Sequence, residues 1–195
     1  MTSTTYAPKA IEILDVAEMH MRRGGFDAIS FRDIATQVGI KSASVHYHFP
    51  QKADLGEAVV NRYRDKILNY LGEPTSYTMV EAIEKLITLY ETALTGSDSV
   101  CLCCVLGSEA DTLPDKVAHE VNVYFTDLSA WARTALNPKG MTKDIDALAT
   151  FTISVLQGAM TMSVAMNDNT QFTAAANLLK GQIQTEEFRQ SLFKG

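Results

Sequence analysis

Apolar residues recur at helical spacing along nearly the whole chain. In the first predicted helix, which begins near Pro8, one face carries Ile11, Leu14, Ala17 and Met21. No segment shows the alternating pattern of a strand, an internal repeat or low complexity. The pattern predicts an all-α fold of about nine helices.

Glycine, proline and capping residues divide this pattern into separate helices. The pair Gly24 and Gly25 ends the first helix, and Ser30 with Asp33 forms a capping box that begins the second, which ends at Gly39. Pro50 ends the third helix, because the residue before a proline avoids the helical conformation. The remaining turn signals predict helices over 42–48, 52–71, 79–95, 100–111, 115–136, 143–167 and 171–193.

The segment from Phe31 to Phe49 has the spacing of a helix-turn-helix: a short helix, a turn at Gly39 and a second short helix. Glycine permits the turn conformation there. The apolar positions that would hold the two helices together are Ile34, Ala35, Val38, Ile40 and Val45. Spacing alone leaves open a generic corner between two helices.

The polar residues of the second short helix suit contact with DNA. Its side chains are short near the N-terminus and include serine, histidine and tyrosine, which hydrogen-bond to phosphates or base edges. Lys52 follows at the start of the next helix, where an ammonium group and a helix N-terminus together favour a phosphate.

The charge distribution supports this placement. The net charge is -6 for the whole chain, which argues against non-specific coating of nucleic acid. Residues 1–66 carry a net charge of +1 and residues 67–195 carry -7. The N-terminal third is therefore the part that can approach phosphates without strong repulsion.

Over about 45 residues the chain resembles the DNA-binding domain of the TetR/AcrR family. The matching residues run from Gly25 to Ala35, through Val38-Gly39-Ile40, and then from Tyr47 to Leu55, with Phe49, Lys52 and Leu55 in the family's spacing. The resemblance implies a helix-turn-helix domain at 1–55 and an effector-binding and dimerisation domain at 56–195. It also implies a homodimer, a palindromic double-stranded DNA operator and a small-molecule effector.

The resemblance also implies roles for individual residues. Ser30, Tyr47 and Lys52 would contact backbone phosphates. Ser42, Ala43 and His46 would face the major groove, with Ser44 close by. The chain departs from the family at Lys41, where many members have a capping serine or threonine. We expect Ser42 to cap the helix one residue later, which would leave Lys41 able to bind a phosphate.

The C-terminal part carries two long apolar stripes. One contains Ile145, Leu148, Thr152, Val155, Ala159, Met162 and Met166, flanked by Phe151, Gly158 and Ser163; the other contains Phe172, Ala176, Leu179, Ile183 and Phe188. The family pairs its last two helices with those of a second subunit, although the same stripes would suit a core within one subunit. As lining of an effector pocket we expect Tyr124, Trp131 and Phe151.

The three cysteines lie together at 101, 103 and 104, and an odd, clustered set does not form a disulfide framework. Cys101 and Cys104 share one face of the predicted helix, which Ser99 would cap. Three interpretations remain open: buried hydrophobic residues, a sensor of oxidants or electrophiles with a lowered thiol pKa, or a metal site with His119. The surrounding residues resemble family members that respond to electrophiles.

These observations predict a cytoplasmic regulator that is not an enzyme and needs no cofactor or metal. No apolar run of about 18 residues indicates a membrane span, and no signal-peptide core follows the N-terminus. The alternatives are a cysteine-dependent enzyme, for which no cysteine, histidine and acid constellation is evident, and a helical adaptor, which leaves Tyr47 and Lys52 unexplained.

Overall fold

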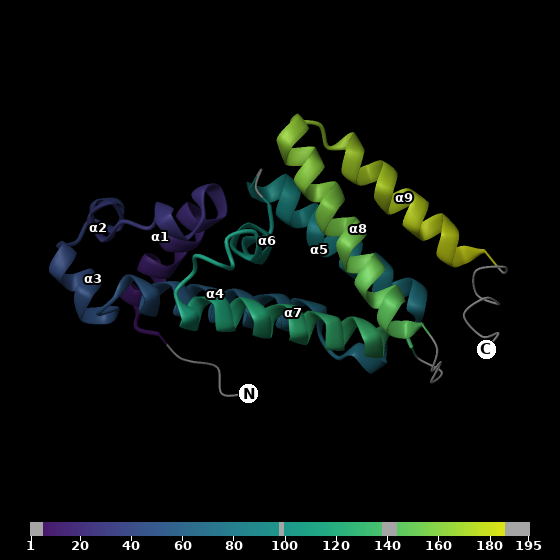
Figure 1. Ribbon diagram of the computed structural model, residues 1–195, viewed down its shortest axis with the longest axis horizontal. Helices are drawn as coiled ribbons and strands as arrows, with labels where there is room; N and C mark the ends of the chain where they lie inside the picture. The colour runs from purple at the N-terminus through teal and green to yellow at the C-terminus, as the bar shows by residue number, and fades with distance from the viewer. Residues whose placement is uncertain (1–5, 98–99, 138–143, 186–195) are drawn as a thin grey trace. The chain divides into compact units, whose positions relative to one another are not determined.

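The all-α prediction is confirmed by the computed structural model, which describes residues 6–97, 100–137 and 144–185 (Figure 1). Within these ranges there are nine α-helices and no strand. The helices are α1 (Pro8–Gly24), α2 (Phe31–Val38), α3 (Ser42–His48), α4 (Lys52–Leu71), α5 (Met79–Ser97), α6 (Leu102–Gly107), α7 (Asp115–Ala135), α8 (Ile145–Met166) and α9 (Thr170–Gln184). Two short 3₁₀ helices, η1 (Phe26–Ala28) and η2 (Pro74–Ser76), lie between them.

The chain forms two compact units that are discontinuous in sequence. The first contains Met1–Ile67 and Cys101–Phe125, and the second contains Leu68–Val100 and Thr126–Gly195. The first unit thus combines α1 to α3 with α6 and parts of α4 and α7. A division of the domains after residue 55 stays a prediction, since these units join α6 to the helix-turn-helix.

Local signals set the ends of α1. Pro8 occupies its first turn, and Gly25 ends it with φ +71° while its amide donates to the Met21 carbonyl at 2.9 Å. Leu14, Ala17 and Met21 are buried as expected, whereas Ile11 is exposed at the edge of that face. The apolar face therefore packs inside the first unit, against α2, α6 and η1.

The helix expected over 100–111 is shorter, because α6 covers only Leu102–Gly107. Cys101 is extended (φ -50°, ψ 132°) and stands immediately before the helix instead of in its first turn. The expected cap, Ser99, lies outside the described residues. After α6 the chain continues in turns, where the Glu109 carbonyl accepts from the Thr112 amide at 2.9 Å. Glu109 therefore lies in a turn after α6 and not within the helix.

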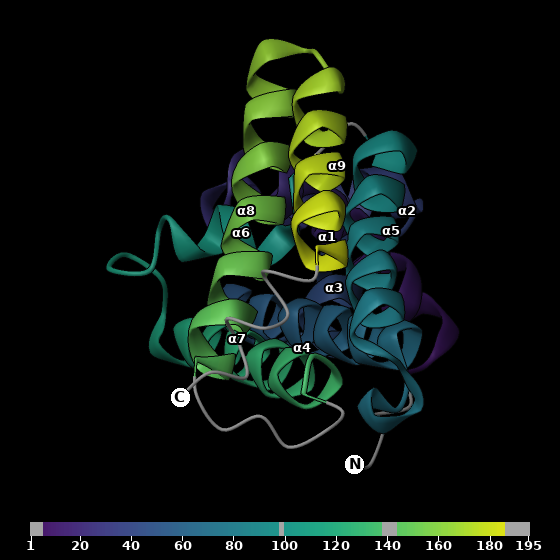
Figure 2. The same cartoon turned by 90° about the vertical axis from the view of Figure 1, so that its right-hand side faces the viewer.

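The second unit is built around α5, α8 and α9, which lie side by side in both views (Figures 1 and 2). Asn167, with φ 52°, ends α8 in the left-handed conformation and lets α9 return along it. At this corner the buried Ser163 hydroxyl accepts from the Phe172 amide at 3.0 Å. The Lys180 ammonium lies 3.6 Å from the Glu84 carboxylate, between α9 and α5.

The long apolar stripe predicted for α8 divides between two faces. Leu148, Thr152 and Ala159 are buried within the unit, but Met162 is 52% exposed and the flanking Phe151 is 49% exposed. On α9, Phe172, Ala176 and Leu179 are buried, while the Ile183 side chain and Phe188 lie outside the described residues. A helix with two apolar faces can serve two partners.

Helix α8 is also long and apolar enough to cross a membrane by length and composition, which the sequence analysis did not expect. In its most apolar stretch 44% is buried inside the structure. A core helix of a soluble protein passes the same test, so this is weak evidence for a membrane span.

Candidate nucleic-acid interface

Helices α2 and α3 pack on each other as a helix-turn-helix. The Ser30 hydroxyl caps α2 by accepting from the Asp33 amide at 3.3 Å, as the sequence predicted. Gly39 has the left-handed conformation (φ 72°, ψ 35°), and the next amide, of Ile40, returns to the Ala35 carbonyl at 2.9 Å. Ile34, Ala35 and Val45 are buried between the helices, which fixes the direction in which α3 presents its polar face.

The outer face of α3 contains the residues expected to meet DNA. Ala43, His46 and Tyr47 are exposed, and Ser42 and Ser44 are half-buried. Tyr47 is 84% exposed, and its only ring contact among the described residues is an edge-on one with His48, 5.3 Å between centroids. A large aromatic side chain that is this exposed does not contribute to the core, so it is a candidate for contact with a partner molecule.

The expectation that Ser42 caps α3 is wrong. Lys41 occupies the N-cap position with extended backbone, and its side chain makes no capping hydrogen bond. Ser42 is the first residue inside the helix. Lysine has no side-chain acceptor that could receive a helix amide, and the Ser44 amide donates instead to the Lys41 carbonyl at 2.8 Å.

His46 is oriented by its neighbours. Its ring meets the Phe31 ring edge-on at 4.6 Å, and its Nδ1 lies 3.4 Å from the Pro50 carbonyl oxygen. The imidazole thus connects α2, α3 and the turn before α4 while remaining exposed. A held, exposed imidazole is suited to reading a base edge, since little rotamer freedom is lost on binding.

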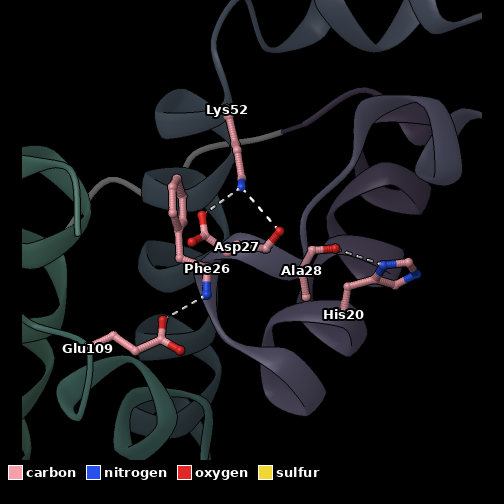
Figure 3. Close-up of polar contacts among 6 residues, drawn as sticks. All are labelled: His20, Phe26, Asp27, Ala28, Lys52 and Glu109. Carbon is pink, nitrogen blue, oxygen red and sulfur yellow. Dashed lines mark hydrogen bonds and ion pairs between the residues drawn. The ribbon is translucent and has the colours of Figure 1, made fainter. Parts of the chain in front are cut away.

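Lys52 is placed by the turn around η1 (Figure 3). Its ammonium lies 3.3 Å from the Asp27 carboxylate and 3.4 Å from the Asp27 carbonyl oxygen. It also stands 4.6 Å above the centroid of the Phe26 ring, a cation–π contact. The cation is thereby held at the start of α4, beside the helix-turn-helix.

The same turn is tied to the segment after α6. The Glu109 carboxylate accepts from the Phe26 amide at 3.0 Å, across 83 residues of sequence (Figure 3). Gly25 makes this approach possible, because a Cβ there would lie 1.8 Å from a Glu109 carboxylate oxygen. Phe26 therefore connects Glu109, through its amide, with Lys52, through its ring. The contact of Glu109 with Phe26 could not be predicted from the sequence, since no local pattern relates the two residues.

His20 also connects elements around this turn. Its Nδ1 lies 3.3 Å from the Ala28 carbonyl oxygen, and its Nε2 lies 2.9 Å from the Gln37 amide nitrogen. The neutral ring with the proton on Nδ1 satisfies both contacts. The imidazole therefore joins α1 to η1 and α2.

Ion pairs fix α4 within the first unit. Arg62 meets Asp15 at 2.7 Å and Glu18 at 3.3 Å on α1, and Arg64 meets Glu120 on α7 at 3.0 Å. Near the start of α4, the Lys116 ammonium of α7 contacts the Asp54 carboxylate. That hydrogen bond lowers the pKa of Asp54 and raises the pKa of Lys116. Helix α7 is thus tied to the end of α4 that carries Lys52.

The cysteines form a second polar cluster in the first unit. Cys101 is 2% exposed, and its sulfur accepts from the Tyr63 hydroxyl of α4 at 3.3 Å and lies 3.5 Å from the Tyr124 hydroxyl of α7. The Cys104 thiol also donates to it. Cys103 is buried and Cys104 half-buried.

The three thiols differ in acidity. Hydrogen bonds, above all the one from Cys104, outweigh burial and lower the pKa of Cys101 to about 6. Donating that bond, together with burial, raises the pKa of Cys104. Burial beside Cys101 raises the pKa values of Cys103 and Tyr63. Cys101 is therefore the thiolate of the cluster, and its neighbours keep their protons. No group of three potential metal ligands occurs among the described residues.

The residues expected to line an effector pocket fall in different places. Tyr124 belongs to the first unit, beside Cys101. Trp131 belongs to the second, where its indole N–H donates to the Gly72 carbonyl at 2.7 Å and its ring meets Tyr77. Phe151 is exposed on α8. The Trp131 indole thus hydrogen-bonds to the residue that follows the C-terminus of α4. Phe151 lies on the surface of its unit and not in its core.

Comparisons with known proteins agree with this geometry. Residues 13–59 match the profile of the bacterial regulatory proteins of the tetR family, and residues 79–178 match that of the LmrA/YxaF-like transcriptional regulator C-terminal domain. Comparison with curated proteins gave no match.

Solved structures of transcriptional regulators superpose along most of the chain. A TetR-family regulator from Agrobacterium tumefaciens is 31% identical (TM-score 0.82), with 89% of this chain and 96% of that one covered. A TetR regulator from Legionella pneumophila is 29% identical (TM-score 0.83), with 93% and 98% covered. The regulator FadR from Bacillus subtilis, in complex with stearoyl-CoA, shares the fold at 15% identity (TM-score 0.71), with 89% and 96% covered. The two matching profiles and the 31% identical regulator, which covers most of the chain, show that the chain belongs to the TetR family of transcriptional regulators.

Proposed function

We propose that this TetR-family regulator is a cytoplasmic repressor that binds a palindromic operator as a homodimer and leaves it when an effector acts on its effector-binding part. In such a dimer the two α3 helices enter successive major grooves about 34 Å apart. The observation that carries the proposal is the outer face of α3, where Tyr47 is 84% exposed above short polar side chains.

Phosphate and base contacts divide among the residues of this face. Ser30, Lys41, Tyr47 and Lys52 would hold phosphates, because they stand at helix starts or carry a hydroxyl or ammonium on the rim. Ser42, Ala43, Ser44 and His46 would meet base edges along α3. The first group fixes the position on DNA, and the second selects the sequence.

The exposed apolar side chains of α8 and α9 support the homodimer. Phe151, Met162 and Met166 recur along one exposed side of α8, and Leu178 is exposed on α9. Gly158 lies on the same side, where a Cβ would meet nothing within 4 Å. Large apolar side chains exposed on one side of a helix are costly in water and indicate an interface. A second copy of the same surface would cover it.

An effector is supported by the fold and by one buried hydroxyl. FadR, which shares the fold, is seen in complex with stearoyl-CoA. In this chain the Thr152 hydroxyl is buried in the second unit with no hydrogen-bond partner among the described residues. An unsatisfied buried hydroxyl costs about 1–3 kcal/mol. A ligand that hydrogen-bonds to Thr152 would recover that energy.

A catalytic role for the cysteines receives less support. A nucleophilic thiol needs a base that takes its proton. The described partners of the Cys101 sulfur are hydroxyl and thiol groups that donate to it. These donors stabilise a thiolate.

Fluorescence anisotropy with DNA fragments flanking the protein's own gene tests the proposal. We expect saturable binding of two chains per site, lost when Tyr47→Ala and Lys52→Ala are combined. His46→Ala should change which operator variants are preferred, whereas Lys52→Ala should weaken all of them alike. Equal binding of wild type and the double variant would contradict the assignment of α3 and α4 to the interface.

A further inference from the structure

Cys101 and Cys104 lie three residues apart, at the two ends of one backbone turn. The Cys101 carbonyl accepts from the Cys104 amide at 3.0 Å, which closes the turn and keeps the two Cα atoms within about 7 Å. Disulfides span Cα separations of about 4.4–6.8 Å. The hydrogen bond from the Cys104 thiol is the largest cause of the lowered pKa of Cys101, in agreement with this short separation.

The two cysteines differ in surroundings as an attacking and a resolving thiol must. Two tyrosine hydroxyls, of Tyr63 at 3.3 Å and Tyr124 at 3.5 Å, surround the Cys101 sulfur. Hydroxyl donors stabilise the anion, which is the reactive form of a cysteine. Cys104 is half-buried and keeps its proton. These tyrosines come from α4 and α7, so the cluster is built by the tertiary fold and not by the cysteine motif alone.

We propose that Cys101 and Cys104 form a peroxide-responsive dithiol, in which oxidation closes an intramolecular disulfide across the start of α6. Formation of the bond goes beyond the proposed function, while its effect on DNA binding rests on that function. Disulfides in reducing compartments are usually transient and redox-sensing, so such a bond suits a regulator.

The reaction balances with hydrogen peroxide as the oxidant. The Cys101 thiolate attacks one peroxide oxygen; an S–O bond forms, the O–O bond breaks, and the departing hydroxide takes a proton to become water. The Cys104 sulfur then attacks the Cys101 sulfur, and the S–O bond breaks as the hydroxyl leaves with the Cys104 proton as a second water. Two thiols are oxidised to one disulfide, and one peroxide is reduced to two waters.

Closing the bond acts on the segment that holds Lys52. It draws the two sulfurs to about 2.05 Å, closer than any hydrogen bond allows, and removes the anion to which the tyrosines donate. At the other end of α6, the Leu106 carbonyl accepts from the Glu109 amide at 3.0 Å, and the Glu109 carboxylate holds the Phe26 amide. A shift of α6 therefore reaches the turn beneath Lys52 through two hydrogen bonds (Figure 3).

The test treats the reduced full-length protein with hydrogen peroxide and measures two quantities: the thiol state by peptide mass spectrometry and operator affinity by anisotropy. We expect a peptide linking Cys101 to Cys104, a loss of two hydrogens per chain, and at least a tenfold weaker operator affinity that dithiothreitol restores. Cys103→Ser is the matched control and should behave as wild type. Cys104→Ser should stop at a Cys101 sulfenic acid, which dimedone traps.

Each other outcome overturns a stated part. A disulfide to Cys103 or between chains, or sulfinic acid without a disulfide, overturns the dithiol. A Cys101–Cys104 bond that leaves operator affinity unchanged overturns the link to DNA. Where the reduced protein binds no operator, the proposed function fails, but the mass measurement still decides the dithiol. Tyr63→Phe, which keeps the aromatic ring, should slow bond formation severalfold in a folded protein.

Discussion

The proposed phosphate contact of Lys52 would compete with a partner that its ammonium already has. In the free protein its ammonium pairs with the fully exposed Asp27 carboxylate at 3.3 Å, and a phosphate would have to replace that carboxylate. We expect Asp27→Asn to raise affinity for all DNA sequences up to about fivefold, since an exposed ion pair is worth up to about 1 kcal/mol. Lys52→Ala should instead weaken binding to all DNA sequences, and the slope of log affinity against log salt concentration should become shallower by roughly one unit.

The matched control is Asp111→Asn, which removes one exposed acidic charge of the same unit but leaves the pair of Lys52 and Asp27 intact. Titrations at several salt concentrations measure both effects. An equal gain in the two asparagine variants would mean that net charge, and not the pairing with Lys52, decides the affinity.

The acidity of Cys101 gives a prediction on pH. Its pKa of about 6 lies below the usual value of ~8.5, so the thiolate should form with a midpoint near pH 6 and peroxide reactivity should be level above pH 7. Cys104→Ala should move that midpoint upward, because the Cys104 hydrogen bond is its largest cause. The other groups that influence the cluster are Tyr63 of α4, Tyr124 of α7, Cys103 of α6, and Glu18 and Arg22 of α1.

The same shift affects stability in a defined direction. A thiol with a depressed pKa releases its proton in the native state first, so it stabilises the fold increasingly between about pH 6 and 8.5. This contribution is lost as pH falls through 6. Ultraviolet absorbance of the thiolate in a Cys103→Ser background measures the midpoint, and a midpoint near 8.5 there would refute the role of the donors.

At the scale of elements, Glu109 joins the segment after α6 to η1. Replacing Glu109 by alanine leaves the part-buried Phe26 amide without its acceptor and should cost about 1–2 kcal/mol of unfolding free energy. Because the Phe26 ring lies under Lys52, operator affinity should fall as well. Denaturant unfolding and anisotropy measure the two losses.

Asp111→Ala is the control for that change, since it removes the same charge from an exposed position two residues away. It should leave both stability and affinity close to wild type. Should Asp111→Ala reduce affinity as much as Glu109→Ala, the effect would come from charge and not from the hydrogen bond to Phe26.

Helix ends that depend on local signals were predictable from sequence. Those of α3 and α4 match the expected ranges because Pro50 and Gly72 act within a few residues. The prediction for α6 was too long, because helical periodicity continues past Gly107 while Glu109 turns toward Phe26. The prediction that the apolar residues of α8 form one stripe on one face was wrong. Periodicity identifies the apolar residues of a helix, but it does not show which of them are buried within the unit and which are exposed.

The same distinction between local and distant signals applies to the candidate site. The α3 surface follows from the order of residues along one helix, and Lys52 from its place at a helix start. The contacts of Cys101 with Tyr63 and Tyr124 span 38 and 23 residues. Nothing local relates such residues, so the sequence left the cysteines open between core, sensor and metal site.

At the scale of the whole molecule, the exposed apolar side of α8 predicts which substitution would dissociate the proposed homodimer. Gly158→Arg places a charge in open space on that side and should raise the dimer dissociation constant at least tenfold without unfolding the chain. Ala159 is buried within the unit, so a charge there should unfold the protein instead. Sedimentation equilibrium and circular dichroism distinguish the two effects.

Ala130→Arg provides the control, because Ala130 is exposed on α7 and lies outside the proposed interface. It should leave association unchanged. A wild-type protein that sediments as a monomer at micromolar concentration would remove the basis of the dimer altogether.

Gly25 and Gly39 share a positive φ, 71° and 72°, but they differ in ψ, -169° and 35°, and in their surroundings. Around Gly39 a Cβ would meet nothing within 4 Å, whereas at Gly25 it would overlap the Glu109 carboxylate. In a library that varies each position in turn, asparagine, which tolerates a left-handed backbone, should survive selection at 39. Position 25 should accept glycine alone, even where a second substitution shortens Glu109, because its combination of φ 71° and ψ -169° is a backbone conformation essentially confined to glycine.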